Sequence, residues 1–182
     1  MKTPGKPFVN VFEAPVTDAR AHGEHFDVRM AQLAAGLGAR EIGANLTRVP
    51  PGKAAFPFHH HHANEEHFYI VSGTGTLRVG AATWPVKPGD YVVNPAGGPE
   101  HAHQLVNTGS EELVYLALST LRYPEVVGYP DSGKTGVRVP ASGATASTRF
   151  IIDDAARDQL QYYDREDGAR VRDLVKAHKP KP

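Results

Sequence analysis

The chain has 182 residues, with 20 basic and 20 acidic side chains and no cysteine. The length suits one domain with additions, and 40% hydrophobic with 22% charged residues is typical of a globular protein. Zero net charge argues against a nucleic-acid partner, and the lack of cysteine excludes disulfides and thiolate ligands. Because no apolar run approaches the ~18 residues of a membrane span and no signal-peptide pattern opens the chain, we expect a cytoplasmic protein with no membrane partner.

Residues 1–40 predict an N-terminal arm. Up to about His25 the apolar residues are scattered without a sustained period, as expected of a segment that crosses the domain surface or a neighbouring subunit. Further on, Met30, Leu33 and Leu37 could form a short helical turn. Because edge strands are commonly covered by a partner, the arm also favours a homodimer.

Residues 41–120 predict a barrel of about eight short strands. Alternation of apolar and polar side chains before Val49 indicates a half-buried strand, and turns rich in proline and glycine follow at close intervals. The expected strands are residues 39–49, 55–61, 67–72, 76–79, 82–86, 91–94, 101–107 and 112–119. Short strands at this spacing are typical of a β-sandwich or jelly-roll barrel.

Residues 121–182 predict a C-terminal extension with a linker, an edge strand and short helices. The proline- and glycine-rich residues 123–140 indicate a loop, and the small residues 141–148 a flexible connection. Residues 150–152 could add an edge strand. The expected helices are residues 155–162, capped by Asp153 or Asp154, and residues 167–178, whose basic end suits a helix C-terminus.

Seven of the ten histidines lie in two stretches, residues 58–68 and 101–103. Imidazoles gathered near carboxylates are ligands that divalent metals take. Residues two apart on a strand share a face, so His59 and His61 point one way while His60 and His62 point the other. Only one of these pairs can face the interior of a barrel, and a slip of one residue would exchange them.

Two further side chains could complete a metal site. Glu66 could return a carboxylate to the face of the histidine pair, and His103 could come from a strand that is distant in sequence but adjacent in a barrel. Three imidazoles and one carboxylate leave coordination positions open. Such a set is typical of a reactive or ligand-binding site rather than a closed structural one.

These motifs resemble those of the cupin superfamily. The residues that carry the first motif are Pro51-Gly52, His59-x-His61, Glu66 and Gly73, and those that carry the second are Gly89-Asp90, Pro95-x-Gly97 and His103-x-x-x-Asn107. Residues 115–120 and 129–134 are similar to a bacterial branch of single-domain cupins. The resemblance implies an all-β fold, the double-stranded β-helix or cupin jelly-roll barrel, here with the short helical C-terminal appendage. It also implies one divalent metal ion inside the barrel and often a dimer.

Two departures from the family pattern affect the ligand assignment. The gap from Gly97 to His103 is longer than in the family, so His101 could compete as a ligand. The histidine run leaves the register open, but four residues between His61 and Glu66 match the branch that the chain resembles. The predicted ligands are His59, His61, Glu66 and His103, holding one ion of zinc, iron, manganese or nickel.

The ligand set leaves more than one class of function open. An enzyme could use the metal as a dioxygenase, or as an isomerase or lyase in which the ion acts as a Lewis acid and Glu66 doubles as a base. The alternative is a module that binds or senses a small sugar or carboxylate without turnover. A fold shared by many chemistries does not name its substrate.

Overall fold

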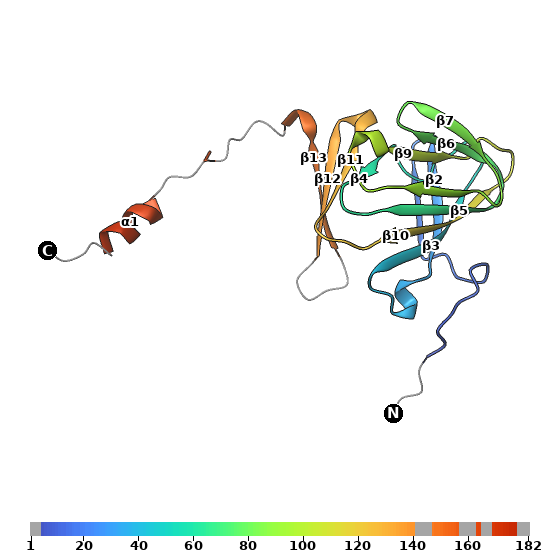
Figure 1. Ribbon diagram of the computed structural model, residues 1–182, viewed down its shortest axis with the longest axis horizontal. Helices are drawn as coiled ribbons and strands as arrows, with labels where there is room; N and C mark the ends of the chain where they lie inside the picture. Colours follow the sequence, from blue (N-terminus) through green and yellow to red (C-terminus); the bar gives the residue numbers. More distant parts are fainter. Residues whose placement is uncertain (1–4, 141–146, 157–162, 165–168, 178–182) are drawn as a thin grey trace.

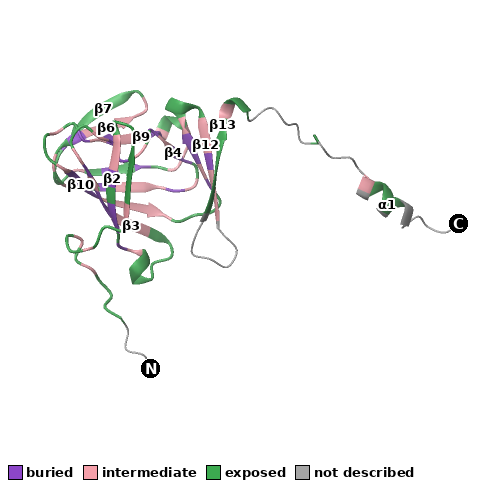
Figure 2. Cartoon of the chain, turned by 180° about the vertical axis from the view of Figure 1, so that it is seen from behind, coloured by how far each residue is buried: buried purple, intermediate pink, exposed green. Residues whose placement is uncertain are grey.

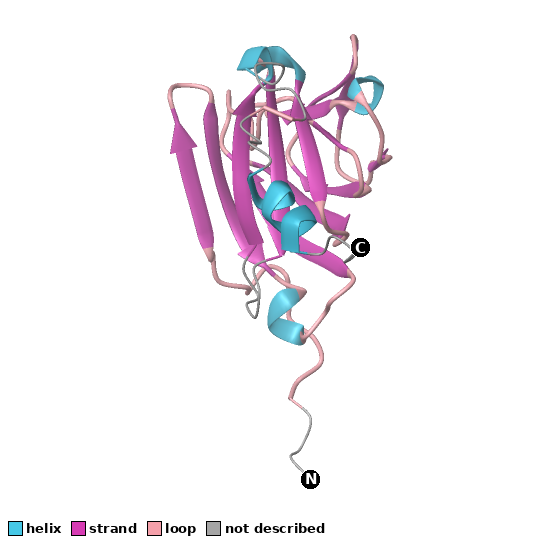
Figure 3. Cartoon of the chain, turned by 90° about the vertical axis from the view of Figure 1, so that its left-hand side faces the viewer, coloured by secondary structure: helices cyan, strands magenta, loops and turns pink. Residues whose placement is uncertain are grey.

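β-Strands are the main regular secondary structure of the described chain, which comprises residues 5–140, 147–156, 163–164 and 169–177 of this computed structural model (Figure 3). The strands are β1 (Asp18–His22), β2 (Phe26–Gln32), β3 (Ile42–Val49), β4 (His60–His61), β5 (Glu66–Ser72), β6 (Gly75–Val79), β7 (Ala82–Val86), β8 (Tyr91–Asn94), β9 (His103–Val106), β10 (Leu113–Thr120), β11 (Glu125–Tyr129), β12 (Lys134–Pro140) and β13 (Ser147–Asp153). The described helical elements are the 3-10 turns η1 (Ala35–Leu37), η2 (Pro99–His101), η3 (Pro130–Ser132) and η4 (Asp154–Ala156), and the helix α1 (Ala169–Ala177).

The strands form an antiparallel jelly-roll barrel (Figure 1). One sheet has the order β1-β2-β3-β10-β5-β8, and the others are β13-β12-β11-β4 and β7-β6-β9. Strand β10 pairs with β3 on one side and with β5 on the other. An isolated bridge between His59 and His103 links the two smaller sheets beside β4 and β9. The fold expected from the sequence is therefore present.

The core lies inside this barrel and is built from alternate residues of its strands. Val49, Ile70 and Leu113 are fully buried, and Phe68 and Tyr115 pack in the same cluster. Burial of such side chains is the main stabilising contribution to a domain of this size. The buried residues concentrate in the barrel strands, whereas the segment before β1 and the described side chains of α1 are largely exposed (Figure 2).

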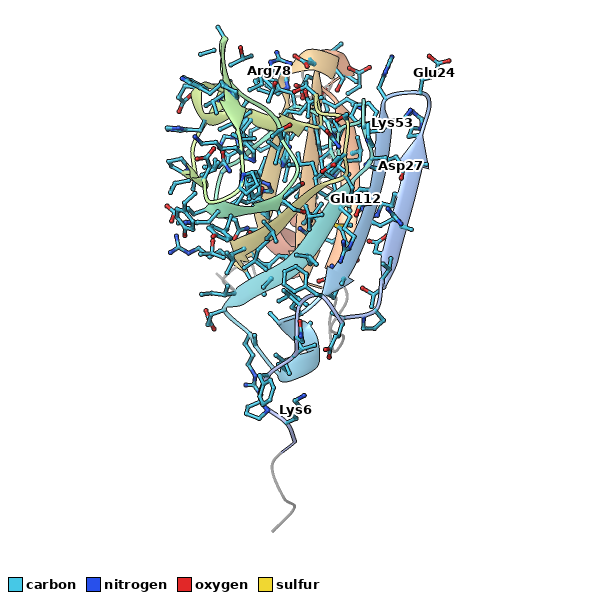
Figure 4. The ribbon with its side chains drawn as sticks, turned by 90° about the vertical axis from the view of Figure 1, so that its right-hand side faces the viewer. Lys6, Glu24, Asp27, Lys53, Arg78 and Glu112 are labelled. Carbon is cyan, nitrogen blue, oxygen red and sulfur yellow. The ribbon has the colours of Figure 1, made fainter. Side chains whose placement is uncertain are left out.

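Arg78 ties the three-stranded sheet to the end of β11. Its guanidinium donates two hydrogen bonds, of 2.6 and 2.9 Å, to the carboxylate of Asp131 in η3. The same group stacks over the ring of Phe58, 3.6 Å from the ring centroid. Figure 4 shows Arg78 at one end of the barrel, the end opposite Lys6. Asp131 is thus held by a partner and does not stand as an unpaired charge.

The prediction of a loop over residues 123–140 is wrong, because this stretch forms β11 and β12. β11 pairs with β4, where Val127 lies opposite His61, and β12 pairs with β11 and β13. Proline and glycine misled the prediction, since Pro124 and Pro130 flank β11 and Gly133 precedes β12. The edge strand expected at residues 150–152 is present within β13, which ends the sheet.

The N-terminal prediction also missed two strands. Residues 18–32 form the β1–β2 hairpin, which extends the six-stranded sheet through the pairing of β2 with β3. Val28 and Met30 are buried with the period of two that a strand requires. The polar residues beside them obscured this period in the sequence. The expected helical turn is limited to η1. The domain limits at 40/41 and 120/121 stay predictions.

The C-terminal helices agree with the sequence where the chain is described. α1 lies inside the helix expected over 167–178, and η4 begins at Asp154. Most of the expected linker, residues 141–146, and residues 157–162 lie outside the described residues. In the described part of the chain, no helix is both long and apolar enough to span a membrane.

Two glycines with nearly equal backbone angles give a matched test of local strain. Gly73 and Gly52 have φ of +76° and +74°, in the region that disfavours other residues. A Cβ on Gly73 would lie 2.9 Å from the Cα of Leu113, whereas a Cβ on Gly52 would meet nothing within 4 Å. We expect Gly52→Ala to cost about 1 kcal/mol of unfolding free energy and Gly73→Ala more than about 3 kcal/mol. Urea unfolding measures both, and equal losses would contradict the packing argument.

Candidate metal centre

Three segments bring the four predicted ligands together inside the barrel. His59 precedes β4 and forms a bridge with His103 at the start of β9, through backbone hydrogen bonds of 3.1 and 2.8 Å. His61 ends β4, and Glu66 begins β5. Because the bridge fixes the backbone of two ligands against each other, the imidazoles of His59 and His103 lie side by side, with ring centroids 4.7 Å apart.

One oxygen of Glu66 faces all three imidazoles. Its Oε2 atom lies 3.2 Å from Nε2 of His103, 3.5 Å from Nε2 of His61 and 3.8 Å from Nε2 of His59. One donor atom from each of His59, His61 and Glu66 fits within 4.8 Å of the others, the spread expected of ligands around one ion. His103 adjoins this group through Glu66 and is buried, with 2% of its surface exposed.

The burial of His61 indicates that the cluster fits a cation. Both ring nitrogens of His61 are buried, and no hydrogen bond to either is found in the described part of the chain. A buried polar group without a partner is costly. A divalent ion at Nε2 would satisfy the ring on the side of Glu66, and imidazole with carboxylate is a donor set that zinc, iron, manganese and nickel accept.

The charges of the cluster also favour a cation. Burial raises the pKa of Glu66, but the imidazoles of His103, His59 and His61 outweigh it and hold this pKa well below its ordinary value. Burial lowers the pKa of His59, which keeps that ring in the neutral form that binds metals. Burial lowers the pKa of His61 too, but the carboxylates of Glu125 and Glu66 raise it to about 9. The proton on His61 is therefore one that a bound metal would displace.

Sequence reasoning missed Glu125, a buried carboxylate behind His61. It is fully buried on β11, and its Oε2 lies 3.8 Å from Nδ1 of His61. The backbone N–H of Ala63 donates to it at 3.2 Å, and the side-chain amide of Asn64 donates to it as well. From this position the carboxylate raises the pKa of His61 without a hydrogen bond to the ring. The only signal in the sequence was an isolated Glu in a Val-rich stretch that was interpreted as a loop.

The structure resolves the register of the histidine run. His59 and His61 face Glu66, while His60 and His62 share the opposite face, with ring centroids 4.9 Å apart. His62 is exposed, whereas His60 is buried against Gly128. The ring of His60 occupies the space that a side chain at position 128 would need.

Two other histidines near the motifs belong to separate contacts. His101 lies in η2 and points toward Glu100, with Nε2 3.8 Å from the carboxylate, so the structure does not bring it to the cluster. His67 forms hydrogen bonds of 2.7 Å with the hydroxyl of Tyr91 and 2.6 Å with Glu65. Glu65 is therefore hydrogen-bonded to His67 and not to one of the predicted metal ligands.

A cavity of about 640 Å³ opens onto the cluster. His59, His61 and Glu66 line one part of it, and Phe56, Phe68 and other apolar side chains line more of its wall. A mostly apolar cavity of this size with a few polar groups is typical of a site for a small molecule. The cluster can therefore be reached by a ligand that is larger than water.

Comparison with known proteins identifies relatives of the central strands. Residues 45–119 match the family model of the cupin domain, a span that contains all four predicted ligands. A glucose-6-phosphate isomerase from Thermococcus onnurineus is 34% identical over 101 residues, 49% of this chain and 50% of the relative. An oxalate-binding protein from Thermotoga maritima is 31% identical over 74 residues, 41% of this chain and 58% of the relative. The chain thus spans about half the length of the curated relatives it matches.

One solved structure covers more of the chain. A proposed sugar phosphate isomerase from Acidithiobacillus ferrooxidans is 32% identical, with a TM-score of 0.63. The match covers 74% of this chain and 81% of that one. The similarity therefore extends beyond the residues of the family model.

Proposed function

Because this chain belongs to the cupin superfamily, we propose that it is a metal-dependent isomerase of small sugar phosphates. The observation that carries the proposal is the set of donors at His59, His61 and Glu66, which line a cavity of about 640 Å³, with His103 adjoining them through Glu66. The names of two relatives support the reaction class, since one is a glucose-6-phosphate isomerase and one a proposed sugar phosphate isomerase.

The chemistry that this site must perform is the transfer of a proton between two neighbouring carbons. In an aldose–ketose interconversion, the hydroxyl-bearing carbon next to the carbonyl loses its C–H proton, and the former carbonyl carbon gains one. The hydroxyl proton moves to the former carbonyl oxygen, so the C=O bond shifts by one carbon. A divalent ion held by the four ligands supplies Lewis-acid polarisation of the carbonyl or hydroxyl oxygen. The apolar part of the cavity wall limits access of water to the reacting carbons.

Glu66 is our candidate for moving the proton. Among the described residues that line the cavity, the carboxylates are Glu66 and Asp131, and Arg78 holds Asp131 in a bidentate pair. Glu66 has one oxygen directed at the imidazoles, so the carboxylate stands where the cluster meets the cavity. A carboxylate within reach of the substrate carbon can act as a general base.

The proposal is tested by isomerisation in heavy water. Metal-loaded protein is incubated with aldose and ketose phosphates in D2O, and NMR follows both interconversion and deuterium uptake at the carbon beside the carbonyl. We expect activity that a chelator removes and that zinc, iron, manganese or nickel restores. Absence of interconversion across the panel with fully metal-loaded protein would contradict the proposal, and substrate-dependent oxygen uptake would replace it with an oxygenase.

A second candidate function is metal-dependent capture of a small carboxylate without turnover. It is favoured by the 31% identity to an oxalate-binding protein. Calorimetry with oxalate distinguishes the two, because a binding protein would hold oxalate tightly only when metal is present and would leave every sugar phosphate unchanged.

A further inference from the structure

We propose that Asn94 is a further residue of the metal centre, where its side-chain amide forms a hydrogen bond with a water ligand of the bound ion. Asn94 is the last residue of β8, a strand that carries none of the four predicted ligands. The inference rests on the metal site of the proposed function but not on the isomerase activity. Asn94 is a positioning residue in this arrangement, because it acts on the ion through the water.

The side chain of Asn94 is buried without a hydrogen-bond partner. Only 3% of the surface of Asn94 is exposed, and neither Oδ1 nor Nδ2 forms a hydrogen bond with any residue that the structure describes. Among the described residues, the other buried side-chain atoms in this state are the two ring nitrogens of His61, a predicted metal ligand. Burying an amide without a partner costs free energy, so a polar group bound beside Asn94 would explain why the amide is there.

Strand pairing places Asn94 beside a metal ligand. Asn94 lies directly opposite Glu66 in the pairing of β8 with β5, so the two side chains leave the sheet on the same face. Val92 and Phe68 form the next pair on that face, and both belong to the barrel core. The face therefore points inward. Since paired residues have Cβ atoms about 5 Å apart, the amide begins next to the carboxylate that faces the imidazoles.

The residues after Asn94 are bonded to a second ligand-bearing segment. The backbone N–H of Gly97 donates a hydrogen bond of 2.8 Å to the carbonyl of His61, and Nδ1 of His60 lies 3.0 Å from the carbonyl of Gly97. The short segment from Asn94 to Gly97 thus runs from the strand of Glu66 to the strand of His61. Asn94 is held in place relative to both ligands.

The position and length of the side chain favour a water as its partner over a substrate or the ion itself. Asn94 is not among the residues that line the cavity of about 640 Å³, so a substrate in that cavity would not contact it. Asparagine is one carbon shorter than glutamate, so from the directly opposite position its amide does not reach as far as the carboxylate of Glu66. Three imidazoles and one carboxylate leave positions for water on an octahedral ion such as Mn²⁺, and an amide can both donate to a water and accept from it.

Two measurements on Asn94→Leu separate a role at the metal from a role in the fold. Leucine keeps a similar volume but has no polar atom, so we expect the variant to bind Mn²⁺ about tenfold more weakly in a titration followed by EPR. The metal-free variant should unfold at a higher urea concentration than metal-free wild type, because a buried amide without a partner has been removed. Asn94→Asp keeps the Oδ1 acceptor and should bind Mn²⁺ more tightly than Asn94→Leu.

Asn107→Leu is the matched control for the change in stability. Asn107 is also buried, but its amide donates to the carbonyls of Val49 and Glu111, and its Oδ1 accepts from the backbone N–H of Gly109. The same substitution there leaves buried partners unpaired, so metal-free Asn107→Leu should unfold at a lower urea concentration than the wild type. The opposite signs at Asn94 and Asn107 distinguish an unpartnered amide from one that holds the fold.

The outcomes separate this inference from the isomerase activity. Weaker Mn²⁺ binding together with higher metal-free stability in Asn94→Leu supports the role of Asn94 whether or not sugar phosphates are turned over. Unchanged Mn²⁺ affinity, or lower stability of the metal-free variant, overturns it even if the wild type is an active isomerase. Binding of Mn²⁺ by Asn94→Asp no tighter than by Asn94→Leu would overturn the assignment to a hydrogen bond.

Discussion

Protein in which His61 and His103 are both replaced by alanine is expected to retain no stoichiometric metal. The two imidazoles contact the same oxygen of Glu66, at 3.5 and 3.2 Å, from strands β4 and β9. Without them only His59 and Glu66 remain of the predicted set, too few for a site that needs at least three protein ligands. Elemental analysis of protein purified without an affinity tag gives the metal content per chain.

The matched control removes two histidines that the structure places elsewhere. His62 is exposed on the opposite face of β4, and His101 points toward Glu100. The double variant His62→Ala with His101→Ala should therefore keep the metal content of the wild type. Full occupancy after loss of His61 and His103 would show that the ligand assignment is wrong.

Replacing Glu125 by alanine is expected to destabilise the fold by about 3 kcal/mol, because it breaks a buried polar network. The change leaves the N–H of Ala63 without its acceptor and removes one of the two acceptors of the Asn64 amide, which keeps the carbonyl of Arg122. It also removes the carboxylate beside His61. Glu125→Gln keeps the shape and one acceptor oxygen and should lose less. Urea unfolding of the metal-free protein measures the free energy directly.

A surface glutamate provides the comparison for this change. Glu111 is exposed, and only its backbone oxygen takes part in a described hydrogen bond, from Asn107. Glu111→Ala should change the free energy of unfolding by less than about 0.5 kcal/mol. If Glu111→Ala and Glu125→Ala gave the same stability, the buried network around His61 would have no energetic weight. Metal content measured in parallel shows whether Glu125 also orients the ligand.

The sequence predicted the strands of the barrel where short apolar segments are separated by turns rich in proline and glycine. β3, β5, β8 and β10 lie within a few residues of their expected ranges. β4 is shorter than expected, since only His60–His61 pairs continuously. β11 and β12 were missed because glycines at 128 and 136 interrupt their pattern, and their partners β4 and β13 come from other parts of the sequence.

The candidate site shows the same division between local and non-local information. Strand parity alone placed His59 and His61 on one face, and the family spacing selected them over His60 and His62. Glu125 could not be found in this way, because it meets His61 only through the pairing of β11 with β4. The sequence also could not show that Arg138 and Arg149 line the cavity, because their position depends on the register of the β12–β13 hairpin, which was not predicted.

The reciprocal backbone bridge between His59 and His103 has a consequence for the order in which the protein is assembled. His59, His61 and Glu66 are neighbours in sequence and can gather around an ion in a short segment, whereas His103 arrives only when β9 docks and the barrel closes. Closing the longer loop is the slower event, because more chain entropy is lost before the contact forms. An ion captured early would then hold the first three ligands in place while the fourth docks, so metal supply during synthesis would affect the yield of folded protein.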